Sequence, residues 1–244
     1  MRAHAYTVAG PLAAFALWEI AVRALGVPVY VLPAPSAIAM KAVADTALMM
    51  DGLGLTLMEA VVGYVAGSVL ALAIAVAFIL SPRLERVGLP ALVALNSVPV
   101  VAFAPVALLW FGSGPASKIA LVIMAVGFAV FVNAHQGLRA VDESAANLLR
   151  SFGAGPLRQM AMLRLPAALP SIMNGLRVAV VRSMIIAIVA EMLAAFKGLG
   201  ATIFESTQQI DFLRAWAAIA VASLASMLWY GVVNWIDQRF VFWR

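Results

Sequence analysis

The sequence predicts an all-α integral membrane protein, and three observations lead to this fold class. Of the 244 residues, 65% are hydrophobic and only 11% are charged, with a mean hydropathy of +1.03. In soluble domains, charged residues usually make up about a quarter of the chain. Apolar stretches recur along the chain, and each approaches the roughly 20 residues that a helix needs to cross a bilayer. About six such stretches leave no room for a second domain, so residues 1–244 are predicted to form one membrane domain.

The first predicted span covers residues 7–25 and is followed by a proline-rich segment. Glu19 and Arg23 stand four residues apart, which is the spacing of an ion pair on a helix. We interpret this span as retained, because no small-residue cleavage site of a signal peptide follows it. Ser36 is placed to cap a short helix that runs to about residue 50. Three charged residues make that helix too polar to span, so we expect it outside the membrane.

Five further spans are predicted. Residues 60–80 carry no charge, and neither do residues 87–117, which contain four prolines. Prolines interrupt the hydrogen bonds of a helix, so the third span should be bent or broken and buried against protein. The remaining three spans are residues 119–138, 171–196 and 215–236.

Basic residues orient these spans, because positive charges resist translocation. If the long polar interval is cytoplasmic, both termini are cytoplasmic too. Cytoplasmic segments then hold nine basic residues, Arg2, Arg83, Arg86, Arg139, Arg150, Arg158, Arg164, Arg239 and Arg244. Outside segments hold Lys41, Lys118, Lys197 and Arg214, with Arg23 as a fifth. The net charge of +5 therefore reflects membrane topology, and no interleaved aromatic and basic patch indicates nucleic-acid binding.

Residues 139–170 form the long polar interval between spans four and five. Gly153 permits a turn that a side chain would obstruct. Pro166 and Pro170 should end one helix and start the next at a fixed angle. The interval would then be a stiff lever that presents a short amphipathic helix to a cytoplasmic partner. A solvated connector is the alternative interpretation.

The stretch from Asn147 to Gly153, with Leu163-Arg164-Leu165-Pro166 after it, resembles the EAA motif of bacterial ABC-importer permeases. The resemblance extends over nearly the whole chain and is closest to the branch that imports taurine, alkanesulfonates, nitrate, bicarbonate and thiamine- or riboflavin-type compounds. Further matching segments are Trp18-Glu19, Leu32-Pro33-Ala34-Pro35-Ser36, Pro99 to Gly112, Asn133 before Gly137-Leu138-Arg139, and Ala190-Glu191-Met192 ahead of Gly198-Leu199-Gly200.

This resemblance implies a permease subunit in the bacterial inner membrane, with a cytoplasmic coupling helix between spans four and five. Its partners would be two ATP-binding-cassette ATPase subunits, a second permease copy forming a homodimer, and an external solute-binding protein. The solute would be small and anionic or vitamin-like. The chain has no GxxxxGK[ST] phosphate loop, so ATP and Mg²⁺ would be bound by the ATPase and no cofactor by this chain.

The resemblance assigns the ATPase contact to a set of loop residues, namely Glu143, Asn147, Leu148, Leu149, Arg150, Gly153, Leu163, Leu165 and Pro166. One departure stands out. Asn147 replaces the acid of the motif, and leucines replace its two alanines. Glu143 lies one helical turn earlier, so it would either substitute for the lost acid or act only as a solvated residue at the helix start.

Four polar residues are candidates for the translocation path. Arg182 lies about 18 Å beyond Pro170 along a helix, near mid-bilayer, so it should face the bundle interior and either contact an anionic solute or make a structural ion pair. Arg177 lies closer to the cytoplasm and can snorkel there. Glu191 is expected to order the Gly198-Leu199-Gly200 turn or to contact solute. Asn133 is expected to hydrogen-bond a neighbouring helix, and His135 to be a satisfied core residue.

Two other classes of protein fit the sequence less well. A stand-alone ion-coupled carrier would often show inverted repeats, and none is evident in the hydropathy pattern. A membrane-embedded enzyme would need paired carboxylates, a nucleophile with a base, or a metal cluster. The chain has no cysteine and only two histidines, and it shows none of these patterns.

Overall fold

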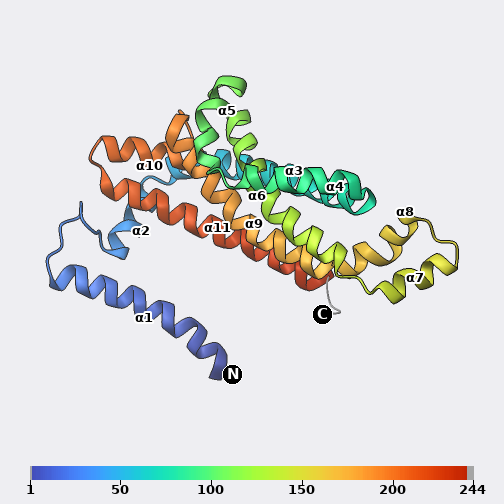
Figure 1. Cartoon of the computed structure of the whole chain (residues 1–244). Coiled ribbons are helices and arrows are strands. Elements are labelled where there is room, and N and C mark those ends of the chain that lie inside the picture. Colours follow the sequence, from blue (N-terminus) through green and yellow to red (C-terminus); the bar gives the residue numbers. More distant parts are fainter. Residues whose placement is uncertain (1, 241–244) are drawn as a thin grey trace.

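The computed structural model describes the backbone of residues 2–240 and the side chains of residues 10–239, and within this range the regular elements are all helices (Figure 1). The helices are α1 (Arg2–Ala24), α2 (Pro35–Ala44), α3 (Thr46–Leu80), α4 (Pro82–Asn96), η1 (Val100–Phe103), α5 (Ala104–Phe111), α6 (Pro115–Arg139), α7 (Glu143–Ser151), α8 (Pro156–Gln159), η2 (Met160–Arg164), α9 (Leu165–Ala194), α10 (Leu199–Gln208) and α11 (Phe212–Phe240).

The core of the molecule lies where α3, α6 and α9 pack on one another. Glycines allow the close approach. A Cβ at Gly67 of α3 would lie 2.9 Å from the carbonyl oxygen of Ile123, and a Cβ at Gly175 of α9 would lie 2.8 Å from the Cβ of Asn133. Small residues commonly mediate such contacts between helices in membranes, where packing rather than water exclusion drives association.

Three helices are long and apolar enough to cross a membrane alone, and they are α3, α6 and α11. Two bent pairs raise the number to five if each pair counts as one span. One pair joins α4 to η1–α5 with a bend of 88°, and the other joins the segment Pro156–Ala194 to α10 with a bend of 47°. The sixth span, expected near α1, stays a prediction.

The third span is broken as its prolines predict. Pro99 precedes η1 and Pro105 lies in the first turn of α5, where a missing N–H costs little. The expectation that this span is buried against protein is wrong for its first half, because no residue of α4 is buried in the isolated chain. Only Ala104 and Ala107 of α5 are buried, and they pack near Leu121 and Ala190.

The short polar helix after the first span ends earlier than predicted. α2 stops at Ala44, and α3 begins at Thr46 and continues without interruption to Leu80. Asp45 forms the junction, and its carboxylate binds Arg214 at 2.8 Å and Lys41 at 3.1 Å. The charges in this region therefore tie α2 and the start of α3 to α11.

Pro166 and Pro170 do not separate two helices as expected. The chain stays helical from Pro156 to Ala194, through a π-helical turn at Met160–Arg164. The N–H of Leu165 donates to the carbonyl of Met160, five residues back. This wider turn leads into Pro166, which occupies the first turn of α9, where its missing N–H is tolerated. α10 was not predicted at all, because its ten residues resemble a polar connection between spans.

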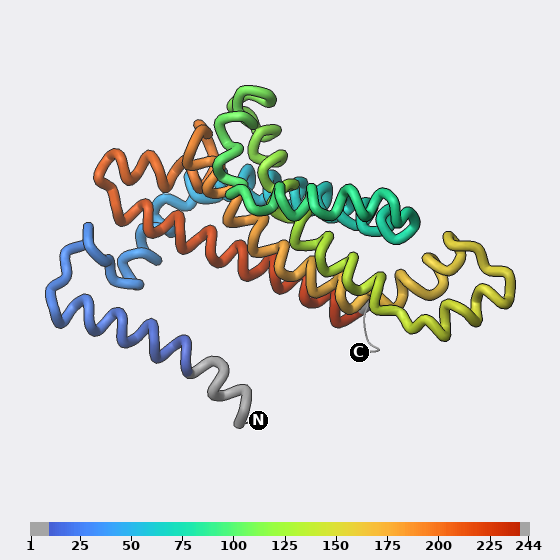
Figure 2. The backbone as a smooth tube through the Cα atoms, in the orientation of Figure 1, coloured from blue at the N-terminus to red at the C-terminus, as the bar shows by residue number. Residues whose placement is uncertain are grey.

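α1 stands apart from the other long helices (Figure 2). Trp18 of α1 packs edge-on against Trp216 of α11, and Glu19 pairs with Arg23 of the same helix at 2.6 Å as predicted. Glu19 also accepts the backbone N–H of Ser36 at 3.0 Å and its hydroxyl at 2.7 Å. Ser36 therefore does not cap its own helix. Instead, the carboxylate of α1 satisfies a free N–H in the first turn of α2.

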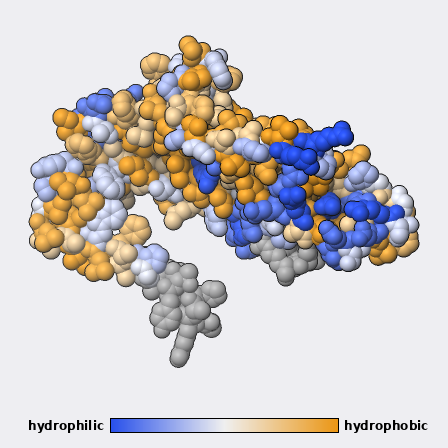
Figure 3. Space-filling view, in the orientation of Figure 1, coloured by the Kyte–Doolittle hydropathy of each residue, from blue (hydrophilic) through white to orange (hydrophobic). Residues whose placement is uncertain are grey.

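Hydropathy divides the surface into two regions (Figure 3). Hydrophilic residues gather at the end formed by α7, α8 and the start of α4, and hydrophobic residues dominate the visible surface of the spans. This division agrees with a bundle in the bilayer and a polar loop beyond it.

Candidate functional site

The 139–170 loop folds as a helix, an elbow and a second helix. Asp142 caps α7 by accepting the N–H of Ser144 at 3.0 Å. At the other end Gly153 adopts φ +77°, and its N–H donates to the carbonyl of Arg150 at 2.8 Å. The left-handed conformation turns the chain sharply, as expected for this glycine.

The loop exposes large apolar side chains. Leu148 and Met162 are each 58% exposed, Leu157 is 71% exposed and Phe152 is 77% exposed. Ala146, in contrast, is buried and holds α7 against the rest of the chain. Exposed apolar groups of this size outside a bilayer are typical of a protein-binding surface.

The predicted contact residues divide into two groups. Glu143, Asn147 and Arg150 line one polar cavity of about 360 Å³ between α7 and the ends of α3, α4 and α6. Asn147 accepts a hydrogen bond from Arg150 at 2.8 Å, so its amide is held on α7 itself. Leu149, Leu163 and Leu165 are half-buried, and Pro166 is exposed.

Arg164 ties the loop to the bundle. Its guanidinium donates to the carbonyl of Leu138 at 2.9 Å, at the end of α6. Gln159 is buried and donates to the carbonyl of Ala154 at 2.7 Å, which closes the elbow from within. The elbow and the start of α9 therefore form one hydrogen-bonded unit, and a solvated connector would not need these bonds.

Arg182 does not face the bundle interior as expected. It is exposed on α9, beside Val178, Val181 and Tyr230, at an open cavity of about 710 Å³. No hydrogen bond or ion pair joins it to another described residue of the chain. A guanidinium is costly in hydrocarbon, so this face of α9 belongs against water or another protein surface rather than lipid.

Arg177 lines the same cavity but is engaged. Its guanidinium pairs with the buried carboxylate of Asp237 on α11 at 3.2 Å and also hydrogen-bonds Asn174. The expected snorkelling to the cytoplasmic surface is therefore replaced by an interhelical ion pair. Asp237 lies in α11, one residue beyond the predicted sixth span of residues 215–236, and was not among the predicted site residues.

Glu191 orders the turn that follows α9, as one of its two interpretations predicts. Its carboxylate accepts the N–H of Gly200 at 2.7 Å and the hydroxyl of Thr56 at 2.8 Å. Thr56 in turn accepts the N–H of Leu199 at 2.9 Å. Gly198 has φ +111°, and a Cβ there would overlap the carboxylate. The acid thus fastens α10 to α3 and α9.

A family model for the binding-protein-dependent transport system inner membrane component matches residues 63–242. The chain belongs to this family. The match covers the second part of α3, α6, α9, the 139–170 loop, and Glu191 with the turn that follows it, whereas Thr56 lies before the matched range.

Curated relatives agree with this assignment. The permease is 32% identical to the formylaminopyrimidine transport permease protein ThiX of Halalkalibacterium halodurans over 93% of this chain and 91% of that protein. It is 28% identical to the taurine transport system permease protein TauC of Escherichia coli over 70% of this chain and 62% of that protein. The permease is therefore of the sulfonate, taurine and nitrate branch of ABC importers, and a stand-alone secondary transporter is not favoured.

A solved structure supports the fold. The methionine ABC transporter MetNI, in an inward-facing conformation, contains a chain that matches 80% of this permease and 97% of its own length, with a TM-score of 0.70 and 17% identity. Permeases of this family typically carry no catalytic activity, and the ATPase lies on separate subunits.

Sequence reasoning missed two buried charges of the permease. Glu59 of α3 and Lys118 of α6 are 1% and 2% exposed. Lys118 donates to the carbonyl of Ala194 at 3.0 Å and to carbonyls of the turn before α6. The predicted spans begin at residues 60 and 119, directly after these two charges, so both residues were placed just outside the spans. An ionisable residue beside an apolar run was the available signal.

Two polar residues near the C-terminal end of α6 differ in outcome. Asn133 donates to the carbonyl of Ala129 in its own helix at 2.9 Å, so the predicted bond to a neighbouring helix is wrong. His135 is buried, stacks on Phe131 and contacts Glu85 of α4 at 2.9 Å, as expected for a satisfied core residue. Among the described residues, no group of three or more potential ligands could hold a metal ion.

Proposed function

We propose that the permease acts as a homodimer with two ATPase subunits, and that an external binding protein delivers a small solute to it. The single observation that carries this proposal is the hydrogen-bonded elbow of the 139–170 loop. It presents α7 and the exposed Phe152 and Leu157 beyond the bundle, and it is continuous with α9 through an unbroken helical path.

The proposed coupling is mechanical. A partner that grips α7 moves the elbow, and the helical segment Pro156–Ala194 transmits the displacement to the turn held by Glu191. In this proposal the helix bundle has two alternative packings, and the state of the ATPase sets their relative populations. Glu143, on the cavity side of α7 with Asn147, takes the place of the motif acid in this contact.

The solute path is proposed along the face of α9 that exposes Arg182. An unpaired guanidinium there supplies a contact for an anionic group of the solute, such as a sulfonate or a carboxylate. Arg177, whose charge Asp237 already balances, acts as a structural neighbour of this path. Asn133 lies against the position of Gly175 and is assigned to helix packing.

In the membrane, the proposed arrangement has six spans with α1 as the first, both termini in the cytoplasm, and α2 on the outer side. The excess of arginines near the polar loop supports this orientation. ATP and Mg²⁺ bind the partner ATPase, and the permease itself carries no cofactor.

Reconstitution tests the proposal. Vesicles are prepared with the permease alone, with the permease and its ATPase, and with the full complex that includes the binding protein. Uptake of taurine, an alkanesulfonate and formylaminopyrimidine is then measured. Uptake should require the ATPase and ATP and should persist when ionophores collapse ion gradients. ATP hydrolysis or gradient-driven uptake by the permease alone would refute the proposal.

A further inference from the structure

α4 leaves a groove along the molecule that the isolated chain does not fill. None of its residues is buried, and Val87 is 76% exposed. The helix lies beside α3, and its start is tied to α6, where Glu85 contacts His135 and Arg139 at 2.9 and 3.1 Å. The space beneath and beside α4 is therefore available to another molecule.

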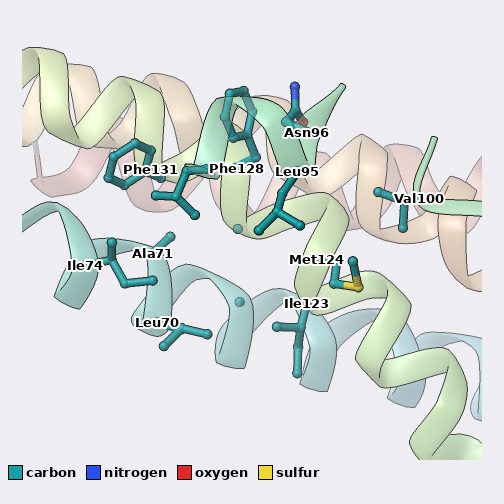
Figure 4. A pocket seen from close by; sticks show the side chains of 13 residues that line it. Leu70, Ala71, Ile74, Leu95, Asn96, Val100, Ile123, Met124, Phe128 and Phe131 are labelled. Carbon is teal, nitrogen blue, oxygen red and sulfur yellow. The ribbon is translucent and has the colours of Figure 1, made fainter. Parts of the chain in front are cut away.

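The deep end of this groove is apolar. A cavity of about 190 Å³ lies between α3, α4 and α6, and Asn96 contributes its one polar side chain (Figure 4). Its walls include Ile74, Leu92, Leu95, Met124 and Phe128. Apolar cavities of about this size exclude water and accept hydrocarbon.

Two further cavities extend this one toward the start of α4 and the end of α6. A cavity of about 480 Å³ shares Phe131 with the first, adds Leu89 and Val93, and reaches Arg139. A cavity of about 320 Å³ shares Leu89 and Arg139 with the second and adds Arg86. Shared lining residues make the three cavities one groove, which we call the α4 groove.

The shallow end of the α4 groove is basic. Arg139 keeps 59% of its side chain exposed although it pairs with Glu85. Arg86 is exposed, and within the described part of the chain it takes part in no ion pair. Glu85 is the one acidic residue that lines the three cavities, and its carboxylate also contacts His135, so the guanidiniums of Arg86 and Arg139 leave an excess of positive charge in the groove.

The dimensions match half a bilayer. Arg86 and Leu95 are nine residues apart on α4, which corresponds to about 14 Å along a helix. The hydrocarbon core of a membrane is about 30 Å thick. A molecule that bridges both ends of the groove therefore carries an anionic group at the surface and an apolar chain that reaches toward the mid-plane.

We propose that the α4 groove binds one anionic phospholipid, with its phosphate on Arg86 and Arg139 and an acyl chain in the cavity beside Phe128. The assignment to the cytoplasmic leaflet rests on the orientation proposed above, whereas binding itself does not. Basic pockets between spans suit such headgroups. A free phosphate would use only the basic end and would leave the apolar cavity empty.

Native mass spectrometry of the full-length permease with its copurifying subunits tests this proposal. The complex is stripped of lipid in detergent and then offered phosphatidylglycerol and phosphatidylcholine in equal amounts. We expect one phosphatidylglycerol retained per permease chain, in preference to phosphatidylcholine. Arg86→Gln should lower its occupancy about fivefold, and Gly127→Leu, which projects into the apolar cavity, should lower it without a change of charge.

Arg83→Gln is the matched control, because Arg83 is exposed on the same helix but lines none of the three cavities. It should keep the wild-type occupancy. Three results would each overturn the proposal. They are wild-type retention of phosphatidylglycerol by Arg86→Gln and Gly127→Leu, binding of phosphatidylcholine as strong as that of phosphatidylglycerol, and displacement of the bound lipid by excess inorganic phosphate. Uptake by the reconstituted complex is measured separately, so a failure here leaves the transport function to its own test.

Discussion

At position 153 the chain leaves α7 with φ +77°, a conformation that costs a residue with a Cβ about 1–2 kcal/mol. Gly155, two residues later, has φ −67° and open space around it. A side chain fits at both positions, but only position 153 has a backbone conformation that favours glycine. Gly155 is therefore a matched control for a substitution at Gly153.

Gly153→Val should uncouple the transporter. The strained elbow would tilt α7, so uptake should fall at least about tenfold while the assembled complex continues to hydrolyse ATP. The ratio of solute transported to ATP hydrolysed is the measurement. Gly155→Val should keep that ratio, and an unchanged ratio in Gly153→Val would contradict the coupling role of the elbow.

Arg182 and Arg177 form a second pair of contrasting residues. Arg182→Met should reduce uptake more than tenfold and leave assembly unchanged, because no described residue depends on its charge. Arg177→Met should instead lower stability by roughly 1–3 kcal/mol, because the buried Asp237 loses an ion pair. Uptake and melting temperature are compared for both variants. Equal losses of uptake and assembly in Arg182→Met would favour a structural role.

At the scale of elements, α10 depends on Thr56. The hydroxyl donates to Glu191 and accepts the N–H of Leu199, so both groups lose a buried partner in Thr56→Val. The expected cost is roughly 1–3 kcal/mol in thermal or denaturant unfolding. Thr46→Val serves as control, because the hydroxyl of Thr46 donates only to the backbone carbonyls of Ala42 and Val43 at the end of α2. A stable Thr56→Val would show that packing alone holds α10.

The junction of α2, α3 and α11 depends on pH. The hydrogen bond from Arg214, with a smaller contribution from Lys41, lowers the pKa of Asp45. A carboxyl with a lowered pKa in the folded state stabilises it above the unfolded value near 4, and this contribution is lost as pH falls through the folded pKa. Wild type should therefore exceed Asp45→Asn in stability by about 1 kcal/mol at pH 7.

This stability difference should shrink below about pH 4, where the unfolded carboxyl is protonated. Melting temperatures of both proteins across pH 3–7 measure it. A difference that stays constant over this range would show that the Asp45 charge does not stabilise the junction.

Helices were predicted well where apolar composition and prolines determine their bounds. They were predicted poorly where contacts between distant residues determine their bounds. The long apolar helices and the break at Pro99 follow from composition and from the missing proline N–H. The start of α3 at Thr46 and the whole of α10 do not, because Arg214 and Glu191, distant in sequence, supply the partners that stabilise them.

For the whole molecule, topology is the decisive prediction. The chain has no cysteine, so single cysteines can be labelled against a blank background. Ser144→Cys in α7 should react with a membrane-impermeant maleimide only from the cytoplasmic side, and Lys197→Cys only from outside. The reverse pattern would invert the proposed orientation, and labelling of both from one side would change the number of spans.

The candidate site was only partly accessible from sequence. The position of Gly153 and the acid at the α10 turn followed from spacing. The exposure of Arg182, the Arg177–Asp237 pair and the buried Glu59 and Lys118 did not, because which face of a helix is covered depends on its neighbours.

The sequence alone was enough to predict a helical membrane protein with several long apolar helices, and to find the polar loop that carries a family motif. Hydrophobicity and short-range spacing are properties of the chain and need no knowledge of contacts. The packing of the helices decided which charges pair, that Arg182 has no hydrogen-bond or ion-pair partner among the described residues, and where α4 leaves a groove. Those outcomes depend on residues far apart in sequence, which meet only when the helices pack.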